Sequence, residues 1–320
     1  MSIIVFIEKD NSTVKKSTYE TVSYATALAK QTEQDIVGVA IGNFEEGELS
    51  SLGKYGLATV INITENTEGW LGQTYASTLE QIAKEKSAKT IVLPSSSLTE
   101  AICARLGAKL NASIATNVIG LPDTSSGFVV KKGIFTGKAF ANVNLSQENK
   151  VISVKTNSFP YQESEGSAIV ESQSVSVDAK DLAITIKETK KSEGKILLPE
   201  AELVVSAGRG LKGPENWGMI DELAELLGAA TACSKPVSDV DWRPHHEHVG
   251  QTGIKISPNL YIAVGISGAI QHLAGVSSSK TIVVINTDED APFFKAADYG
   301  IVGDAFEVIP RLIEAVKKVS

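Results

Sequence analysis

Short runs of apolar residues alternate with stretches of helical periodicity along the first third of the chain. The apolar runs have the length of single buried strands, and the periodic stretches have the length of ordinary helices. The predicted strands cover residues 3–7, 36–41, 59–63 and 90–93, and the predicted helices cover residues 18–30, 70–84 and 98–110. This alternation is typical of a largely parallel sheet covered by helices.

The pattern changes twice further along the chain. Residues 113–186 form short β-rich segments separated by turn residues, and we expect them to complete the N-terminal domain. Residues 187–195 are polar and charged, as in a connector. After the connector, strand-like runs near Leu203, Ala229, Leu260, Thr281 and Tyr299 alternate with helical stretches at 216–227, 269–275 and 305–318. The sequence predicts an α/β protein with an N-terminal domain over 1–190 and a doubly wound, Rossmann-like domain over 200–320.

Two strand-to-helix junctions in the second half are rich in glycine and hydroxyl residues. The apolar run at 202–207 leads into Gly208-Arg-Gly-Leu-Lys-Gly213, and the run at 260–264 leads into Gly265-Ile-Ser-Gly-Ala-Ile-Gln-His272. Backbone N–H groups at such junctions bind phosphate, because the first N–H groups of a helix have no partner within it. The two junctions predict a dinucleotide site, while tight turns without a ligand remain the alternative for the glycines.

The residues around the first junction favour a flavin dinucleotide over NAD. An NAD site usually has an acidic residue at the end of the next strand, where it binds the ribose hydroxyls. Here that strand ends at Ser234 and Lys235, and Arg209 lies inside the glycine loop. A hydroxyl and a cation replace the expected carboxylate, and Arg209 adds a second cation nearby, so a nicotinamide cofactor is disfavoured.

Two further features suit a flavin ring. The segment Val249-Gly-Gln-Thr-Gly253 offers an amide, a hydroxyl and flexible backbone to the polar edge of an isoalloxazine. His272 follows Gly268 by four residues and is expected in the first turn of a helix, where a donor would favour an anionic reduced flavin. A packed or capping histidine is the alternative.

Composition excludes several other classes of function. The chain has 320 residues, a net charge of -8 and only two cysteines, so nucleic acid, anionic membranes and a disulfide framework are not expected. No apolar run approaches the roughly 20 residues that span a bilayer, and the N-terminus has no basic leader, so we expect a cytoplasmic protein without membrane insertion.

His245-His-Glu-His248 could suggest a metal site. It is interpreted as a surface loop, because consecutive positions rarely converge on one metal ion.

Four segments of the second half, taken together, resemble the α subunit of electron transfer flavoprotein. They are residues 204–211, 249–253, 261–275 and 297–304, whereas residues 1–186 resemble that family only in layout. The resemblance implies FAD as the cofactor, with Arg209 at its phosphate and adenosine portion, Ser234 and the 249–252 loop along the flavin, and Thr252 at the N5 side. It places His272 at the O2 side, a cradle for the pyrophosphate at 267–271, and Asn286 and Asp304 toward the adenosine. The implied cofactor-binding residues are Arg209, Ser234, Lys235, Val249, Gly250, Gln251, Thr252, Ser267, Gly268, Ala269, Ile270, Gln271, His272, Asn286 and Asp304.

Lys235 departs from the family pattern. The residue after Ser234 is usually an arginine over the isoalloxazine, and lysine retains the charge but lacks a planar fork that can stack and donate twice. Our hypothesis is that Lys235 retunes the flavin potential.

The resemblance also implies partners. The α subunit of this family pairs with an AMP-binding β subunit and carries electrons, rather than acting as an enzyme with its own substrate. Its donors are flavin dehydrogenases such as the acyl-CoA dehydrogenases of fatty acid β-oxidation, and its acceptor is a quinone oxidoreductase or another acceptor. Three alternatives stay open: an NADH-dependent electron-bifurcating subunit, a stand-alone NAD-binding oxidoreductase, and a non-catalytic nucleotide-binding regulator.

Overall fold

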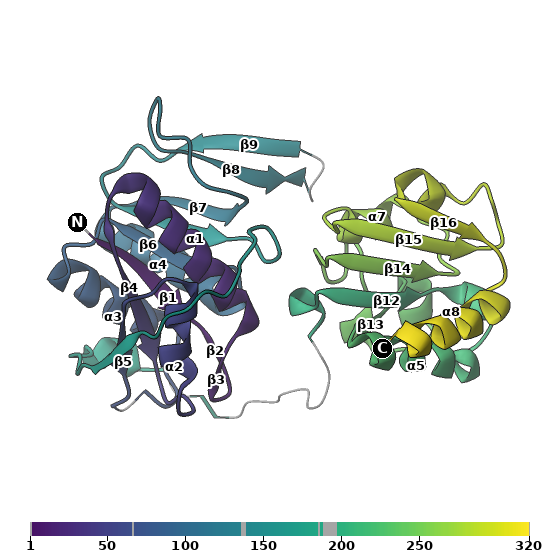
Figure 1. Ribbon diagram of the computed structural model, residues 1–320, viewed down its shortest axis with the longest axis horizontal. Coiled ribbons are helices and arrows are strands. Elements are labelled where there is room, and N and C mark those ends of the chain that lie inside the picture. The colour runs from purple at the N-terminus through teal and green to yellow at the C-terminus, as the bar shows by residue number, and fades with distance from the viewer. Residues whose placement is uncertain (1, 66, 136–138, 185, 188–196, 320) are drawn as a thin grey trace. The chain divides into compact units, whose positions relative to one another are not determined.

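The computed structural model describes residues 2–65, 67–135, 139–184, 186–187 and 197–319 (Figure 1). The chain forms two compact units, built from the described residues of Met1–Gly133 with Phe140–Lys190 and of Ile134–Ala139 with Lys191–Ser320. The predicted connector at 187–195 lies outside the described residues from residue 188 onward.

The first unit is built on a nine-stranded sheet. Its strand order is β11 (Ile169–Ser172), β5 (Thr59–Ile63), β4 (Asp35–Ile41), β1 (Ser2–Ile7), β6 (Thr90–Pro94), β10 (Lys150–Val154), β7 (Ser113–Val118), β8 (Val129–Ile134) and β9 (Ala139–Asn144). Pairing is parallel from β11 through β7, and β8 pairs antiparallel with β7. The short strands β2 (Lys9–Asp10) and β3 (Thr13–Val14) form a separate antiparallel pair.

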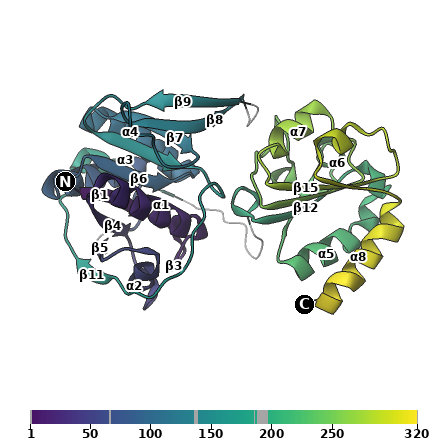
Figure 2. The ribbon, with the colours of Figure 1, turned by 45° about the horizontal axis from the view of Figure 1, so that its top comes forward.

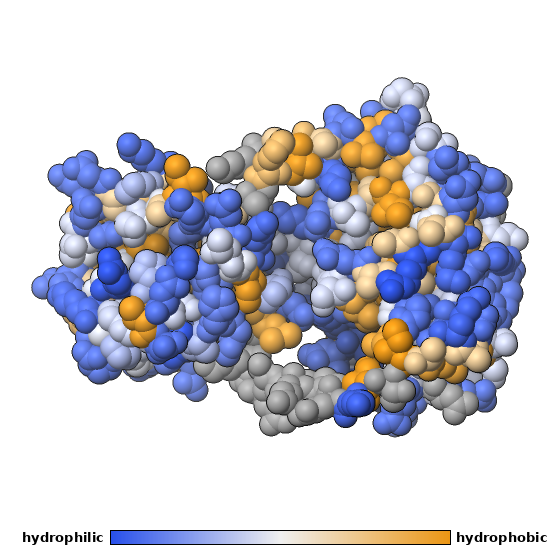
Figure 3. Space-filling model, turned by 180° about the vertical axis from the view of Figure 1, so that it is seen from behind, coloured by the Kyte–Doolittle hydropathy of each residue, from blue (hydrophilic) through white to orange (hydrophobic). Residues whose placement is uncertain are grey.

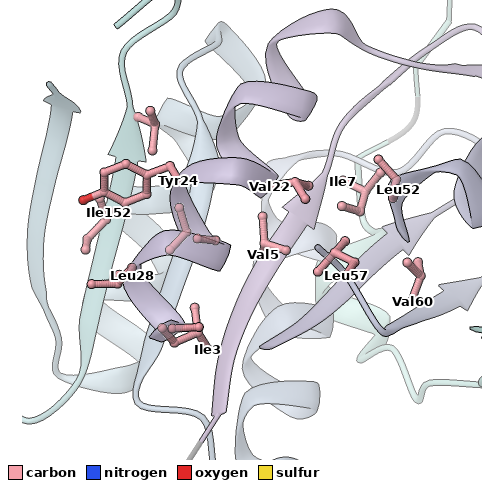
Figure 4. Packing of buried hydrophobic residues seen from close by; sticks show 14 of the residues in the cluster. Ile3, Val5, Ile7, Val22, Tyr24, Leu28, Leu52, Leu57, Val60 and Ile152 are labelled. Atoms are coloured by element: carbon pink, nitrogen blue, oxygen red, sulfur yellow. The ribbon is translucent and has the colours of Figure 1, made fainter. Parts of the chain in front are cut away.

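Helices cover both faces of this sheet because its central strands are apolar on both sides. Every residue of β1 is buried. Ile3, Val5 and Ile7 of β1 share one apolar core with α1 (Lys16–Thr32), where Figure 4 shows Val5 near Val22. Ile4 and Phe6 of β1 belong to a second core with α3 (Gly72–Glu85) and α4 (Ser97–Leu110). A short helix, α2 (Glu48–Ser51), lies between β4 and β5 along the chain.

The second unit contains a five-stranded parallel sheet. Its strand order is β13 (Ala230–Cys233), β12 (Leu203–Ala207), β14 (Leu260–Val264), β15 (Thr281–Asn286) and β16 (Tyr299–Val302). The chain adds β13 on one side of β12 and the later strands on the other, so the order reverses between β12 and β14. Crevices at such switch points, outside the carboxyl ends of the strands, are common ligand sites in parallel sheets.

Helices again lie on both faces of this sheet. Helices α5 (Gly218–Leu227) and α8 (Ala305–Val319) pack on one face, and α7 (Ile270–Val276) lies on the other (Figure 2). A further α-helix, α6 (Lys235–Ser238), is a single turn after β13. The predicted α/β class, with one mostly parallel sheet and a second parallel sheet, is confirmed.

Polar side chains cover much of the surface, with apolar groups in separate patches on the face seen in Figure 3. Among the described residues, no helix combines the length and apolar character that crossing a bilayer requires. Cys103 and Cys233 are free and buried, and burial raises the pKa of each thiol to about 12.

Truncation of the core beneath α1 tests the packing of the first unit. Leu28 on α1 is fully buried, so Leu28→Ala should lower the free energy of unfolding by about 2–5 kcal/mol. Leu182 is half exposed, and Leu182→Ala should change the free energy of unfolding by less than about 0.5 kcal/mol. Urea unfolding followed by circular dichroism measures both, and equal effects of the two truncations would contradict this packing.

Candidate functional site

A pocket of about 520 Å³ lies in the second unit, at the carboxyl ends of β12, β13 and β14. This is the reversal point of the strand order, and the volume is typical of small-molecule sites. The pocket is lined by Arg209, Ser234, Lys235, Pro236, His248, Val249, Gly250, Gln251, Thr252, Gly265, Ile266, Ser267, Ala269, Gln271 and His272.

The first glycine-rich junction uses five of its six backbone N–H groups internally. Gly208 N–H donates to the carbonyl of Val264, and Gly210 N–H donates to that of Gly265. The N–H groups of residues 211–213 donate to carbonyls of the same loop. A Cβ on Gly210 would lie 2.6 Å from the Gly265 Cα, so this glycine allows the ends of β12 and β14 to approach closely. Phosphate capture by the backbone of this junction, which the sequence predicts, stays a prediction: among residues 208–213, only the N–H of Arg209 has no acceptor in the described part of the chain.

The second junction is different. Within the described part of the chain, the backbone N–H groups of residues 266–271 donate to no protein acceptor. Gly265 and Gly268 have φ angles of +60° and +82°, which bend the chain between β14 and α7. A Cβ on Gly268 would also lie 2.5 Å from the Cβ of Phe293. Glycine is thus required at 268 for both conformation and space, and the loop it shapes has six N–H groups that can bind an anion.

A turn at 249–254 forms a second wall of the pocket. Val249 N–H donates to the carbonyl of Cys233 at the end of β13, and Gln251 N–H donates to that of Gln271 on α7 at 2.7 Å. The side chains of Gln251 and Thr252 are exposed and line the pocket. The turn is thereby fixed to two elements while its amide and hydroxyl groups face solvent.

His272 is buried in the pocket wall. Its Nε2 lies 2.8 Å from the hydroxyl of Tyr261, and its Nδ1 is buried with no hydrogen-bond partner among the described residues. Burial, followed by the influence of His248, lowers the pKa of His272 to about 4, so the ring is neutral near pH 7. A His272 contact to the O2 side of a flavin stays a prediction, because Nε2 already bonds to Tyr261 and Nδ1 is enclosed.

Charge in the pocket lining is positive or neutral. The lining contains Arg209 and Lys235 and no carboxylate among its described residues. Arg209 is exposed and forms no ion pair within the described ranges, whereas Lys235 Nζ lies 2.8 Å from Asp239 Oδ1. Such a lining favours an anionic ligand.

The structure brings most of the predicted residues together. Eleven of the fifteen line the pocket, and the other four are Gly268, Ile270, Asn286 and Asp304. Asn286 donates from Nδ2 to the carbonyl of Ile266 at 3.1 Å, so it supports the second junction from behind. Asp304 accepts from the backbone N–H of Phe306 at the start of α8, and its other oxygen lies 3.5 Å from Lys212 Nζ.

Four lining residues were not predicted from the sequence: Pro236, His248, Gly265 and Ile266. The interpretation of residues 245–248 as a surface loop is wrong for half of the segment. His245 and His246 are exposed, but Glu247 and His248 are each 2% exposed. Glu247 pairs with Arg243 through contacts of 2.6 and 2.8 Å. The glutamate four residues after an arginine is the sequence signal that could have indicated this pair.

No group of three or more potential metal-ligating side chains occurs in the described portion of the chain. His248 instead packs within the 249–254 turn, where a Cβ on Gly253 would lie 2.8 Å from its Nδ1. Burial lowers the pKa of His248, as do His245 and Lys235.

Two family models match this chain. Residues 197–277 match the electron transfer flavoprotein FAD-binding domain, and residues 3–180 match the electron transfer flavoprotein domain. Three similar relatives carry the name electron transfer flavoprotein subunit alpha. The protein of Bacillus subtilis is 32% identical over 99% of this chain and 98% of its own length. Those of Syntrophomonas wolfei and Pseudomonas aeruginosa are 34% and 35% identical over 98% and 99% of this chain, and over 98% and 100% of their own lengths.

Burial of His272 predicts a pH dependence of stability. Its pKa is about 4 when folded against an ordinary value of 6.5, so between these values the unfolded chain binds a proton that the folded chain does not. The free energy of unfolding should therefore fall as the pH drops from 6.5 to 4, by up to about 3 kcal/mol from this residue. Urea unfolding across this range should show a smaller fall for His272→Gln. Parallel pH profiles of the two proteins would contradict the shifted pKa.

Proposed function

The chain belongs to the electron transfer flavoprotein family, and on that premise we propose that it is the α subunit of a heterodimer that carries electrons on FAD. Its donors are flavin dehydrogenases, such as the acyl-CoA dehydrogenases, and its acceptor is a quinone oxidoreductase. The observation that carries the proposal is the pocket at the β12–β14 reversal, where six backbone N–H groups without a described protein acceptor lie beside a lining without carboxylates. The α-subunit names of the relatives support pairing with a β subunit. We propose that this partner binds AMP.

The residues of the pocket fit FAD in their chemistry. The pyrophosphate of FAD is anionic, and the loop at 266–271 offers backbone N–H groups that no described acceptor uses. Arg209 adds an exposed cation at the rim. The polar edge of the isoalloxazine needs directed donors and acceptors, which Gln251, Thr252 and Ser234 offer.

These residues divide the work of holding the cofactor. The 266–271 loop holds the pyrophosphate, and the 249–252 turn with Ser234 and Lys235 lines the flavin. Asn286, at the carboxyl end of β15, and Asp304, after β16, are next along the same sheet edge and take the adenosine end. FAD supplies the electron-accepting ring, while the protein binds it, orients it and sets its electrostatic surroundings.

Co-expression with the cognate β subunit tests this function directly. We expect a yellow complex with one bound FAD that a donor dehydrogenase reduces and a quinone acceptor reoxidises, as followed by visible absorbance. A colourless complex would contradict the proposal and leave a nucleotide-binding regulator. Rapid bleaching by NADH would instead identify the bifurcating type.

Arg209 provides a test of the phosphate end. A hydrogen bond to a charged group contributes about 1.5–3 kcal/mol, so Arg209→Gln should weaken FAD binding by roughly 10- to 150-fold. Arg311 is exposed on α8 and outside the pocket, and Arg311→Gln should leave the affinity unchanged. Fluorescence titration of FAD into the complex measures both, and equal affinities for the two variants would remove Arg209 from the site.

Lys235 provides a test of the flavin end. Arginine can stack on the ring and donate two hydrogen bonds, so Lys235→Arg should stabilise the electron-rich reduced form and raise the midpoint potential by roughly 20–60 mV. Lys318→Arg makes the same substitution on α8, outside the pocket, and serves as the control. Potentiometry that finds the Lys235→Arg midpoint unchanged would refute the retuning hypothesis.

A further inference from the structure

One buried hydrogen bond connects the pocket wall to the sheet behind it. Tyr261 is the second residue of β14 and is fully buried, and its hydroxyl lies 2.8 Å from His272 Nε2 on α7. The ring of Phe293 encloses the pair, with its centroid 6.3 Å from that of Tyr261 and 5.7 Å from that of His272. The position of the imidazole is therefore fixed by packing as well as by the bond.

The direction of this hydrogen bond follows from the chemistry of its two groups. Burial raises the pKa of Tyr261, so the phenol keeps its proton. Burial lowers the pKa of His272 to about 4, so the imidazole holds one proton on its two nitrogens. A phenol is the more acidic donor and an unprotonated imidazole nitrogen is the more basic acceptor. The favoured arrangement is therefore O–H···Nε2, with the single imidazole proton on Nδ1.

We propose that Tyr261 is a positioning residue, whose hydroxyl donates to His272 Nε2 and thereby holds the imidazole proton on Nδ1 in the pocket wall. Neither Tyr261 nor its bond to His272 was predicted from the sequence. The effect on the cofactor rests on the proposed function, whereas the position of the proton does not.

The consequence is a neutral imidazole of fixed tautomer, and therefore of fixed dipole direction, in the wall of the pocket. Without the phenol, Nε2 loses its donor, and the proton can distribute over both nitrogens or move to Nε2. An imidazole dipole that no longer keeps one direction stabilises the reduced cofactor less. We expect Tyr261→Phe to lower the equilibrium constant for one-electron reduction by about tenfold, which corresponds to ~59 mV in the midpoint potential.

The experiment uses the full chain in its FAD-loaded complex, with 15N-labelled histidine. Imidazole 15N shifts distinguish the two neutral tautomers, and His272→Gln assigns the signal. The wild type should show His272 protonated on Nδ1. Tyr261→Phe should move the signal toward the other tautomer and lower the midpoint, whereas the control Tyr299→Phe, at an exposed tyrosine of β16, should change neither.

Each outcome decides the proposal. A wild-type signal showing the proton on Nε2, or an unchanged tautomer in Tyr261→Phe, would overturn it. If Tyr261→Phe does not fold, the wild-type spectrum alone is sufficient, because it reports which nitrogen carries the proton. Failure of the complex to bind FAD would contradict the proposed function instead, and the tautomer could still be measured without the cofactor.

Discussion

The site depends on which backbone N–H groups the protein leaves without an acceptor. Two glycine-rich junctions lie side by side at the carboxyl ends of β12 and β14. At the first, protein carbonyls accept from the N–H groups of Gly208 and Gly210, and the glycines serve close packing of the two strand ends. At the second, the N–H groups of residues 266–271 have no acceptor in the described part of the chain. Because an unsatisfied buried N–H is costly, such a row is stable only where solvent or a ligand supplies acceptors.

The surroundings of this loop strengthen its preference for an anion. The described pocket lining contains no carboxylate, and its two histidines have lowered pKa values, so Arg209 and Lys235 provide its formal charges. Uncharged groups also support the loop. Asn286 bonds to the backbone of the loop, and Phe293 packs where a side chain on residue 268 would clash. The loop is therefore preorganised by contacts behind it, and its N–H groups are available to an anionic ligand.

Local sequence patterns predicted the individual strands and helices well, but they predicted the order of the strands in the sheet only in part. Strands β1 and β5 follow from apolar runs bounded by polar residues, and α1 follows from its periodicity. The insertion of β10 between β6 and β7 and the addition of β11 beside β5 depend on contacts between distant residues, which local patterns do not encode.

In the candidate site, too, features with a local sequence signal were predicted, and features that depend on contacts between elements were not. The segments 249–253 and 265–272 were found because glycine, hydroxyl and amide residues at strand ends have specific uses. The sequence leaves the role of Gly208 and Gly210 open, since the same motif can serve phosphate binding or close packing. His248 was missed because its burial depends on the space left by Gly253 in the folded turn. The bond between Tyr261 and His272 joins two elements and has no signature within either.

Amide hydrogen exchange in the complex, with and without FAD, tests the central claim most directly. The account predicts that FAD slows exchange at the N–H groups of residues 266–271, because they gain phosphate acceptors, while those of residues 210–213 change little. Slowing at 210–213 with no change at 266–271 would contradict it, since the first junction and not the second would then hold the pyrophosphate.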